Sequence, residues 1–202
     1  MKKINNWRQV YVSKPYFSII ITTYNNINTI KKTLDSVVNQ TLNNDKYEII
    51  VIDDQSTDGT MEILSAYNES NLKIYQLDEN SGGPSQPRNK GIRESNGDYI
   101  YFLDGDDWLD LNVLETISLN YLHLDSDIII SKVIKDNDGK QSIHAKFMTI
   151  KENYNVNGND IPYLYYYLGP SGKFIKRELI FKNNISFPLH ITCISEKIKY
   201  FS

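Results

Sequence analysis

A chain of 202 residues with a net charge of −3 is long enough to bury one core, and it lacks the basic field that would favour a nucleic-acid partner. Its lone cysteine, Cys193, argues against a disulfide scaffold and favours a reducing compartment, so we expect a cytoplasmic protein. No apolar run reaches the roughly 18 residues that span a bilayer, and the opening "MKKINNWRQVYVSKP" lacks the apolar region of a signal peptide.

Predicted strands and helices alternate through the first 110 residues. The strand candidates are the continuous apolar runs "YFSIIITT", "YEIIVIDD", "LKIYQLD" and "DYIYFLD". Helices are expected in "NINTIKKTLDSVVNQ" and "GTMEILSAYNES" and towards the end of "PSQPRNKGIRESNG". Strands that are buried on both faces read as continuous apolar runs, so this order predicts an α/β fold with a mostly parallel sheet and helices on both faces.

The remainder of the chain is expected to complete the same domain. "NVLETISLNYLHL" predicts a helix, "SDIIISKVIK" a strand, and "DNDG" the turn of a hairpin whose return lies in "KQSIHAKFMTI". "DIPYLYYYLGPSGKFIKRELIFKNN" predicts two helices separated by a Gly-Pro break. We therefore divide the chain into an N-terminal extension (1–15), a first half (16–110) and a second half of the same domain (111–202).

Polar clusters follow all four of the first predicted strands. They read "TTYNN", "DDQSTD", "ENSGG" and "DGDDW". In open α/β sheets, ligands bind beyond the carboxyl ends of the strands, so these clusters mark the expected binding edge. Acids after a strand also commonly cap the next helix, and for "DDQSTD" that alternative stays open.

The stretch "YIYFLDGDDWLD" ends a predicted buried strand in a group of carboxylates. Gly105 lets the backbone turn tightly, so that Asp104 and Asp106 can approach one point. A divalent cation would relieve their repulsion, and Mg²⁺ or Mn²⁺ takes carboxylate and phosphate oxygens as ligands. This pattern favours an enzyme that binds a nucleoside diphosphate, and the absence of GxGxxG, GxxxxGK[ST] and HExxH motifs disfavours the competing site types.

Five segments of the chain together resemble family 2 glycosyltransferases of the GT-A fold. They are "SIIITTYNN", "LDSVVNQTL", "YEIIVIDDQSTDGT", "NSGGPSQPRNKGI" and "GDYIYFLDGDDWLD", and they lie mostly within residues 16–110. "NSGGPSQPRN" further resembles the enzymes that add N-acetylglucosamine to ribitol-phosphate wall teichoic acid, and related capsule and lipopolysaccharide transferases stay open. The resemblance implies a GT-A (Rossmann-like) domain whose C-terminal part is truncated, because the chain stops at Ser202 inside an expected helix.

The resemblance also implies a UDP-sugar site. Asp54 would accept a hydrogen bond from the uracil with support from Asp53. Arg88 would reach the diphosphate region, since its fork geometry suits phosphate, and an ion pair with a neighbouring acid is its alternative role. The expected donor-binding residues are Thr22, Thr23, Tyr24, Asp53, Asp54, Asn80, Arg88, Asp104 and Gly105.

Further roles are implied for the acids around Gly105. Asp106 would be the main protein ligand of Mn²⁺ or Mg²⁺, with Asp104 holding the ribose or the metal. Asp107 is expected to cap the following helix, and Trp108 to pack beneath the site.

The resemblance places the general base of an inverting enzyme in a Glu-Asp pair after a "GKLFKR"-like segment. Here "SGKFIKRELI" matches that segment, and the alignment of "LHITCISEKIKYFS" puts Glu196 on the Glu and Lys197 on the Asp. A protonated lysine cannot accept a proton. A register shifted by one, with Glu196 as the base and Ser195 beside it, stays open.

The expected function is transfer of a sugar, N-acetylglucosamine or another hexose, from a UDP-sugar to a cell-surface polysaccharide, teichoic acid or lipid-linked acceptor. Lys197 and the early chain end leave open a catalytically impaired or fragmentary nucleotide-sugar or glycan-binding module. A nucleotidyltransferase is a third reading. No nucleic-acid partner is expected, whereas homo-oligomerisation and peripheral contact with the inner face of the membrane stay open.

Overall fold

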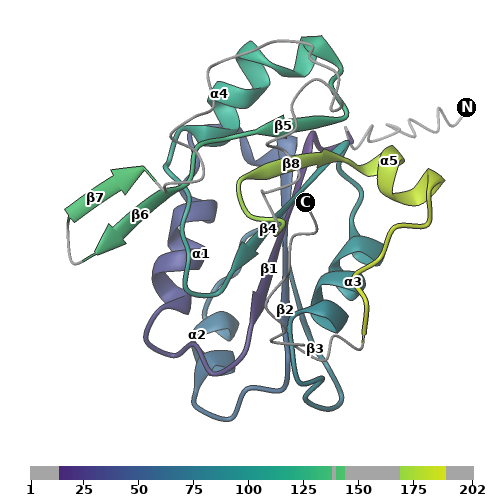
Figure 1. Cartoon of the computed structure of the whole chain (residues 1–202). Helices are drawn as coiled ribbons and strands as arrows, with labels where there is room; N and C mark the ends of the chain where they lie inside the picture. The colour runs from purple at the N-terminus through teal and green to yellow at the C-terminus, as the bar shows by residue number, and fades with distance from the viewer. Residues whose placement is uncertain (1–13, 138–139, 144–168, 190–202) are drawn as a thin grey trace, which may run out of the picture.

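The computed structural model describes residues 14–137, 140–143 and 169–189. A six-stranded sheet in the order β3-β2-β1-β4-β8-β5 forms the centre of this part of the protein (Figure 1). The first four strands are parallel, and every residue of β1 and β2 is buried, as their continuous apolar sequences predicted. These strands are β1 (Phe17–Thr23), β2 (Tyr47–Asp53), β3 (Leu72–Gln76) and β4 (Tyr99–Asp104).

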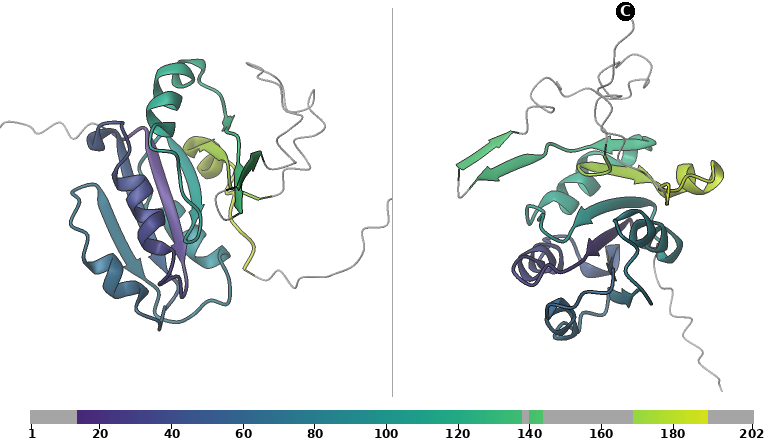
Figure 2. Two further views of the ribbon diagram at one scale, coloured as in Figure 1. Left: turned by 90° about the vertical axis from the view of Figure 1, so that its left-hand side faces the viewer. Right: turned by 60° about the horizontal axis from the view of Figure 1, so that its bottom comes forward.

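Two apolar layers cover the two faces of the sheet, and Figure 2 shows helices on either side. Because side chains alternate along a strand, Ile19 and Ile21 pack with α1, α2 and α4 on one face, whereas Ile20 packs with α3 and α5 on the other. The helices are α1 (Ile30–Val38), α2 (Thr60–Ser65), α3 (Ser85–Glu94), α4 (Val113–Asn120) and α5 (Arg177–Lys182), with 3₁₀ turns η1 (Asn44–Lys46) and η2 (Leu122–Leu124). The predicted α/β class, a mostly parallel sheet with helices on both faces, is confirmed.

The carboxyl ends of three neighbouring strands are in register. Thr22 is paired with Asp104 of β4, and Thr23 is paired with Asp53 of β2. Because these strands run in the same direction, the polar residues that follow them emerge at one edge of the sheet. The sheet therefore brings three of the predicted polar clusters to a common place.

The outer half of the sheet differs from the sequence prediction. "SGKFIKRELI" was expected to be helical, but it forms β8 (Lys173–Lys176) before α5 begins. β8 runs antiparallel between β4 and β5 (Ile128–Ile130), and the fully buried Phe174 packs against Tyr101. Pairing with the open edge of β4 outweighs the local helical pattern.

The single strand expected in "SDIIISKVIK" is divided in two. β5 ends at Ile130, and β6 (Ile134–Asn137) turns away to form a separate hairpin with β7 (Lys140–Ile143). Figure 1 shows this hairpin projecting beside α1. The helix predicted around "DIPYLYYYLG" lies outside the described residues. Within the described part of the chain, no helix combines the length and the apolar character needed to cross a bilayer.

Candidate active site

Arg88 of α3 meets Asp104 at the end of β4. Its Nη2 donates a 2.7 Å hydrogen bond to Asp104 Oδ1, and its side chain is only 12% exposed. The Thr22 hydroxyl donates a longer hydrogen bond, of 3.4 Å, to the same oxygen. The Arg88 Nε is buried and has no partner among the described residues, so the guanidinium is incompletely satisfied. Arg88 therefore forms the ion pair that was its alternative predicted role, and its Nε–H remains without an acceptor.

Asp54 is held by the loop that follows β3. Its carboxylate accepts 2.9 Å hydrogen bonds from both the backbone N–H and the hydroxyl of Ser81. The Asn80 amide contacts the same carboxylate at 3.3 Å and the Asp54 carbonyl oxygen at 2.9 Å. Asp54, which is 4% exposed, therefore fixes the loop at the end of the neighbouring strand.

Asp53 has an open hydrogen-bonding position. Its Oδ2 accepts hydrogen bonds from Ser56 N–H at 2.9 Å and from Gln76 Nε2 at 3.0 Å. Its Oδ1 is buried and has no partner within the described residues. A buried carboxylate oxygen without a donor is costly, so it marks a place where a ligand N–H or O–H can bind.

Gly105 lies in a space that leaves no room for a side chain. Its N–H donates to the Thr22 carbonyl oxygen at 2.9 Å, and its own carbonyl oxygen accepts hydrogen bonds from the Thr29 and Thr33 hydroxyls at 2.8 and 3.0 Å. A Cβ at Gly105 would lie 2.7 Å from Asn26 Oδ1. The backbone between the two flanking acids is thus fixed by α1 and β1.

Residues 104–110, here called the carboxylate loop, carry concentrated negative charge. Partial burial, and then the charges of Asp106 and Asp104, raise the pKa of Asp107 above its ordinary value. The Asp106 side chain is exposed. No group of three or more His, Cys, Asp or Glu side chains within the described residues could by itself hold a metal ion. Hard oxygen donors in this number fit a Mg²⁺ or Mn²⁺ ion that is shared with the phosphates of a ligand.

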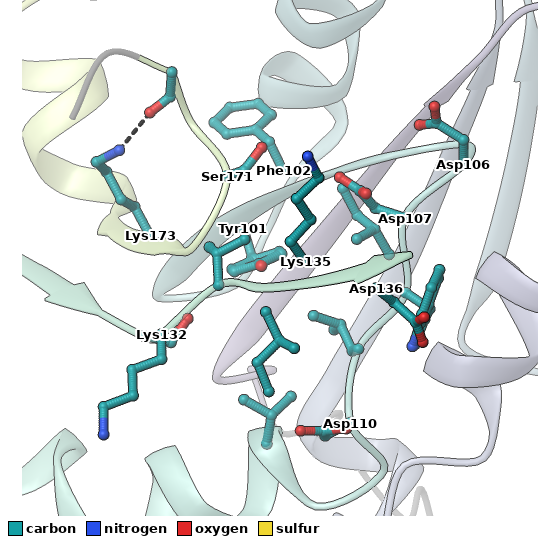
Figure 3. Close-up of a pocket in the computed structure, with 18 of the residues that line it drawn as sticks. Tyr101, Phe102, Asp106, Asp107, Asp110, Lys132, Lys135, Asp136, Ser171 and Lys173 are labelled. Carbon is teal, nitrogen blue, oxygen red and sulfur yellow. Dashed lines mark hydrogen bonds between the residues drawn. The ribbon is translucent and has the colours of Figure 1, made fainter. Parts of the chain in front are cut away.

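A cavity of about 570 Å³ borders the carboxylate loop (Figure 3). Its floor includes the buried Tyr101 of β4, whose hydroxyl accepts a 3.3 Å hydrogen bond from Gly172 N–H. Burial raises the pKa of Tyr101 to about 12, so this hydroxyl stays protonated at neutral pH. One wall consists of loop residues 106–110, and the facing walls come from residues 131–136 and 169–173.

A comparison with known protein families shows which family the chain belongs to. The family described as Glycosyl transferase family 2 matches residues 18–181. This chain belongs to glycosyltransferase family 2. The GT-A fold expected from the resemblance is also confirmed, since crystal structures of S. aureus TarS align with most of this chain.

Similar proteins include teichoic acid enzymes. The poly(ribitol-phosphate) beta-glucosyltransferase of Bacillus spizizenii is 34% identical, over 90% of this chain and 28% of its own length. The poly(ribitol-phosphate) beta-N-acetylglucosaminyltransferase TarP of Staphylococcus aureus is 36% identical, over 84% of this chain and 51% of its own. The crystal structure of S. aureus TarS 1-349 in complex with UDP-GlcNAc aligns with a TM-score of 0.72 at 33% identity, covering 85% of this chain and 48% of the other. The chain thus spans about half the length of these relatives, or less.

One expectation for this family 2 site is wrong. Asp107 does not cap the next helix, because α4 begins only at Val113 with Asn112 before it. Trp108 lines the cavity beside the carboxylate loop, where it is 37% exposed and the Lys32 Nζ lies 3.0 Å from the centre of its ring, and its packing beneath the donor site stays a prediction.

Most of the other predicted site residues lie at the carboxyl edge of the sheet, and two lie outside the described residues. Thr22 and Thr23 are buried at the end of β1, whereas Tyr24 is 48% exposed just beyond them. The sheet brings these residues together with Asp53, Asp54, Arg88, Asp104, Gly105 and Asp106, and Asn80 joins through Asp54. Glu196 and Lys197 lie outside the described residues, so their role stays a prediction.

Sequence reasoning missed two contacts that support the site. The sequence predicted no role for Ser81, although its small side chain beside Asn80 is suited to hydrogen-bond an acid at a neighbouring strand end. Phe187 gave no signal, because its partners are distant in sequence. Its ring lies 5.3 Å from the Arg88 guanidinium carbon and 5.1 Å from the Phe102 ring.

Proposed function

We propose that this chain contains the donor-binding part of an inverting glycosyltransferase that moves a sugar from a UDP-sugar to a hydroxyl of a polyol-phosphate polymer. The observation that carries the proposal is that Asp53 and Asp104 end the two strands on either side of β1, where Arg88 of α3 is bonded to Asp104. The names of TarP and of the Bacillus enzyme support a poly(ribitol-phosphate) acceptor, and the TarS complex supports UDP-GlcNAc as a donor.

The donor nucleotide would lie across the ends of β1, β2 and β4. The unpartnered Oδ1 of Asp53 accepts a hydrogen bond from the base, while Asp54, whose own carboxylate is occupied by Ser81, keeps the neighbouring loop in place. Arg88 turns its unused donor capacity towards the diphosphate, because guanidinium groups bind phosphate oxygens in pairs. Asp104 stays bound to Arg88 and so keeps this positive charge at the strand end.

A divalent ion, Mn²⁺ or Mg²⁺, would be held by Asp106 with support from Asp104, and its remaining ligands would be phosphate oxygens. Bound there, it supplies charge stabilisation for the departing UDP. The exposed position of Asp106 supports this assignment, because its carboxylate is open to a ligand. The charges of Asp106 and Asp104 also help to raise the pKa of neighbouring Asp107, after the larger effect of burial.

The proposed general base is Glu196, which would deprotonate the acceptor hydroxyl. Lys197, at the position where the family pattern has an acid, favours a second candidate: a module that binds the sugar nucleotide without transferring the sugar. The two functions can be told apart by one product, UDP, because only the enzyme releases UDP from the sugar nucleotide when acceptor is added.

The test is calorimetric titration of the chain with UDP, with and without Mn²⁺. We expect binding that needs the metal and that weakens at least tenfold in Asp106→Ala, about 1.4 kcal/mol. Asp110→Ala is the matched control, since Asp110 belongs to the same loop but follows Leu109 and is no proposed ligand. The proposal fails if UDP does not bind in the presence of Mn²⁺, or if the two variants bind it equally.

Acceptor-dependent release of UDP from UDP-GlcNAc then separates the enzyme from the binding module. Release that depends on Glu196 supports transfer. UDP-GlcNAc binding with no release supports the module, and Lys197→Asp should then restore turnover if the lysine alone is responsible.

A further inference from the structure

We propose that the cavity beside the carboxylate loop is the acceptor subsite, and that Lys135 binds a phosphodiester group of the acceptor there while Lys132 adds positive charge to the same wall. This inference rests on the proposed function, because it assigns the acceptor side of the same site. It identifies the residues that would distinguish an anionic polymer from a neutral glycan.

Lys135 lies on β6 and lines the cavity. Figure 3 shows its side chain extending into the space between Ser171 and Asp107. Lys132 lines the cavity from the segment before β6, and its amino group points outward from the lining residues (Figure 3). Within the described residues, neither lysine takes part in an ion pair, whereas six other lysines are paired with acids: Lys14, Lys31, Lys46, Lys73, Lys90 and Lys176. Both ammonium groups are therefore available to an external anion.

The two walls of the cavity have opposite charge. The loop wall contributes Asp106, Asp107 and Asp110. The facing walls carry a net positive charge, from three lysines and one acid: Lys132, Lys135, Lys173 and Asp136. A phosphodiester is repelled by the first wall and attracted by the second, so it has one favourable orientation. In that orientation the phosphate lies on the lysine wall, and a hydroxyl of the same repeat unit is directed towards the carboxylate loop. The charge pattern therefore positions the nucleophile as well as the anion.

The size of the cavity suits one repeat unit of a polyol-phosphate chain. About 570 Å³ is within the usual range of roughly 300–1,000 Å³ for small-molecule sites. Lysine, a point charge on a flexible stem, can follow a phosphate as the polymer shifts by one unit. A neutral polysaccharide would leave both lysines without a partner.

The hairpin also contains a matched control. Asn137 pairs with Lys140 and Lys135 pairs with Ser142, so Lys135 and Lys140 lie on the same face of the β6-β7 sheet. Lys140 is exposed at the hairpin turn and does not line the cavity. Lys140→Gln therefore removes the same charge from the same surface without altering the proposed subsite.

The experiment measures binding of a ribitol-phosphate oligomer to the whole chain by calorimetry, at low and at physiological salt, with free ribitol as the uncharged probe. We expect the oligomer to bind and free ribitol not to bind measurably. Lys135→Gln should weaken the affinity for the oligomer roughly tenfold. Lys132→Gln should weaken this affinity less, and Lys140→Gln should bind the oligomer as tightly as the unmodified chain does. Loss of Lys135 should also reduce the dependence of affinity on salt, because one charge contact is removed.

UDP binding in the presence of Mn²⁺ is measured on the same samples. Unchanged UDP affinity in Lys135→Gln shows that the variant is folded and that the donor side is intact. If UDP fails to bind the unmodified chain, the proposed function is wrong. If UDP binds but the oligomer does not, or if Lys135→Gln and Lys140→Gln bind the oligomer equally, the acceptor subsite is overturned while the donor assignment stands.

Discussion

At the scale of single residues, Gly105 shows how closely the site is built on its scaffold. The sequence suggested glycine for its backbone freedom. The structure gives a different reason, since a Cβ would lie 2.7 Å from Asn26 Oδ1 and 2.9 Å from Thr23 Oγ1. Thr23 is the last residue of β1 and Asn26 lies in the loop that follows it, so the acids on either side of Gly105 are positioned by the end of the neighbouring strand.

We predict that Gly105→Ala costs about 1–3 kcal/mol of folding stability and lowers the affinity for UDP at least tenfold. The reason is that the carboxylate loop must move away from β1. Chemical denaturation and calorimetry measure the two effects. Gly83→Ala is the control: a Cβ there would meet no atom within 4 Å beyond its chain neighbours, and the stability of the variant should change by less than about 0.5 kcal/mol. Equal behaviour of the two variants would refute the steric explanation.

At the scale of elements, α3 is joined to the segment after α5 by a reciprocal pair of hydrogen bonds. The Asn89 amide donates to the Phe187 carbonyl oxygen and accepts from the Phe187 N–H, both at 2.8 Å. The Phe187 ring then packs edge-on to Phe102 and beside Arg88. This contact places an aromatic ring beside the arginine that is bonded to Asp104, so it connects the end of the described chain to the donor site.

Phe187→Ala should destabilise the protein by about 2 kcal/mol, less than the 3–5 kcal/mol typical of a fully buried ring, because Phe187 is only partly buried. The substitution should also lower the affinity for UDP several-fold, since Arg88 loses its aromatic neighbour. Phe181→Ala, at a 42% exposed position on α5, provides the comparison by thermal denaturation and UDP titration. The proposed support of Arg88 is wrong if only stability, and not UDP affinity, distinguishes the two variants.

At the scale of the whole molecule, Glu48 ties together the strands at the end of the sheet opposite to the site. Its carboxylate accepts hydrogen bonds from Ser18 of β1 at 2.7 Å, from Lys73 of β3 at 2.9 Å and from the Asn96 N–H just before β4. Burial alone raises the pKa of Glu48. The hydrogen bonds from Lys73, Ser18 and Asn96 together outweigh burial and leave the pKa below its ordinary value of 4.5.

This depressed pKa predicts the pH dependence of folding stability. The ionised form of Glu48 is favoured in the folded protein, so its contribution is complete above pH 4.5 and is lost as the pH falls through the lower, folded pKa. Glu48→Gln should lower the free energy of unfolding by about 2 kcal/mol at pH 7. It should also flatten the decline of this free energy as the pH falls below 4.5. Glu79→Gln, at an exposed position, is the control in denaturant titrations from pH 7 to 3. Parallel curves for all three proteins would contradict the prediction.

The sequence predicted the central sheet well because each of β1, β2 and β4 carries its own apolar run, and the polar clusters that follow them mark the binding edge. It failed for β8, whose extended state depends on Tyr99–Asp104 being available as a partner. At the site, the acids were found from their place at strand ends. The Asn89–Phe187 contact was not, because these residues are 98 positions apart and neither belongs to a pattern that predicts the other.

The position of β8 between β4 and β5 has a consequence for biosynthesis. β5 is translated first but cannot join the sheet until Lys173–Lys176 have left the ribosome, because β8 is its only link to β4 in the described sheet. Until then the apolar outer edge of β4 has no native partner, and such an edge can pair with another nascent chain. Holding that edge until the late strand arrives is a task suited to a molecular chaperone.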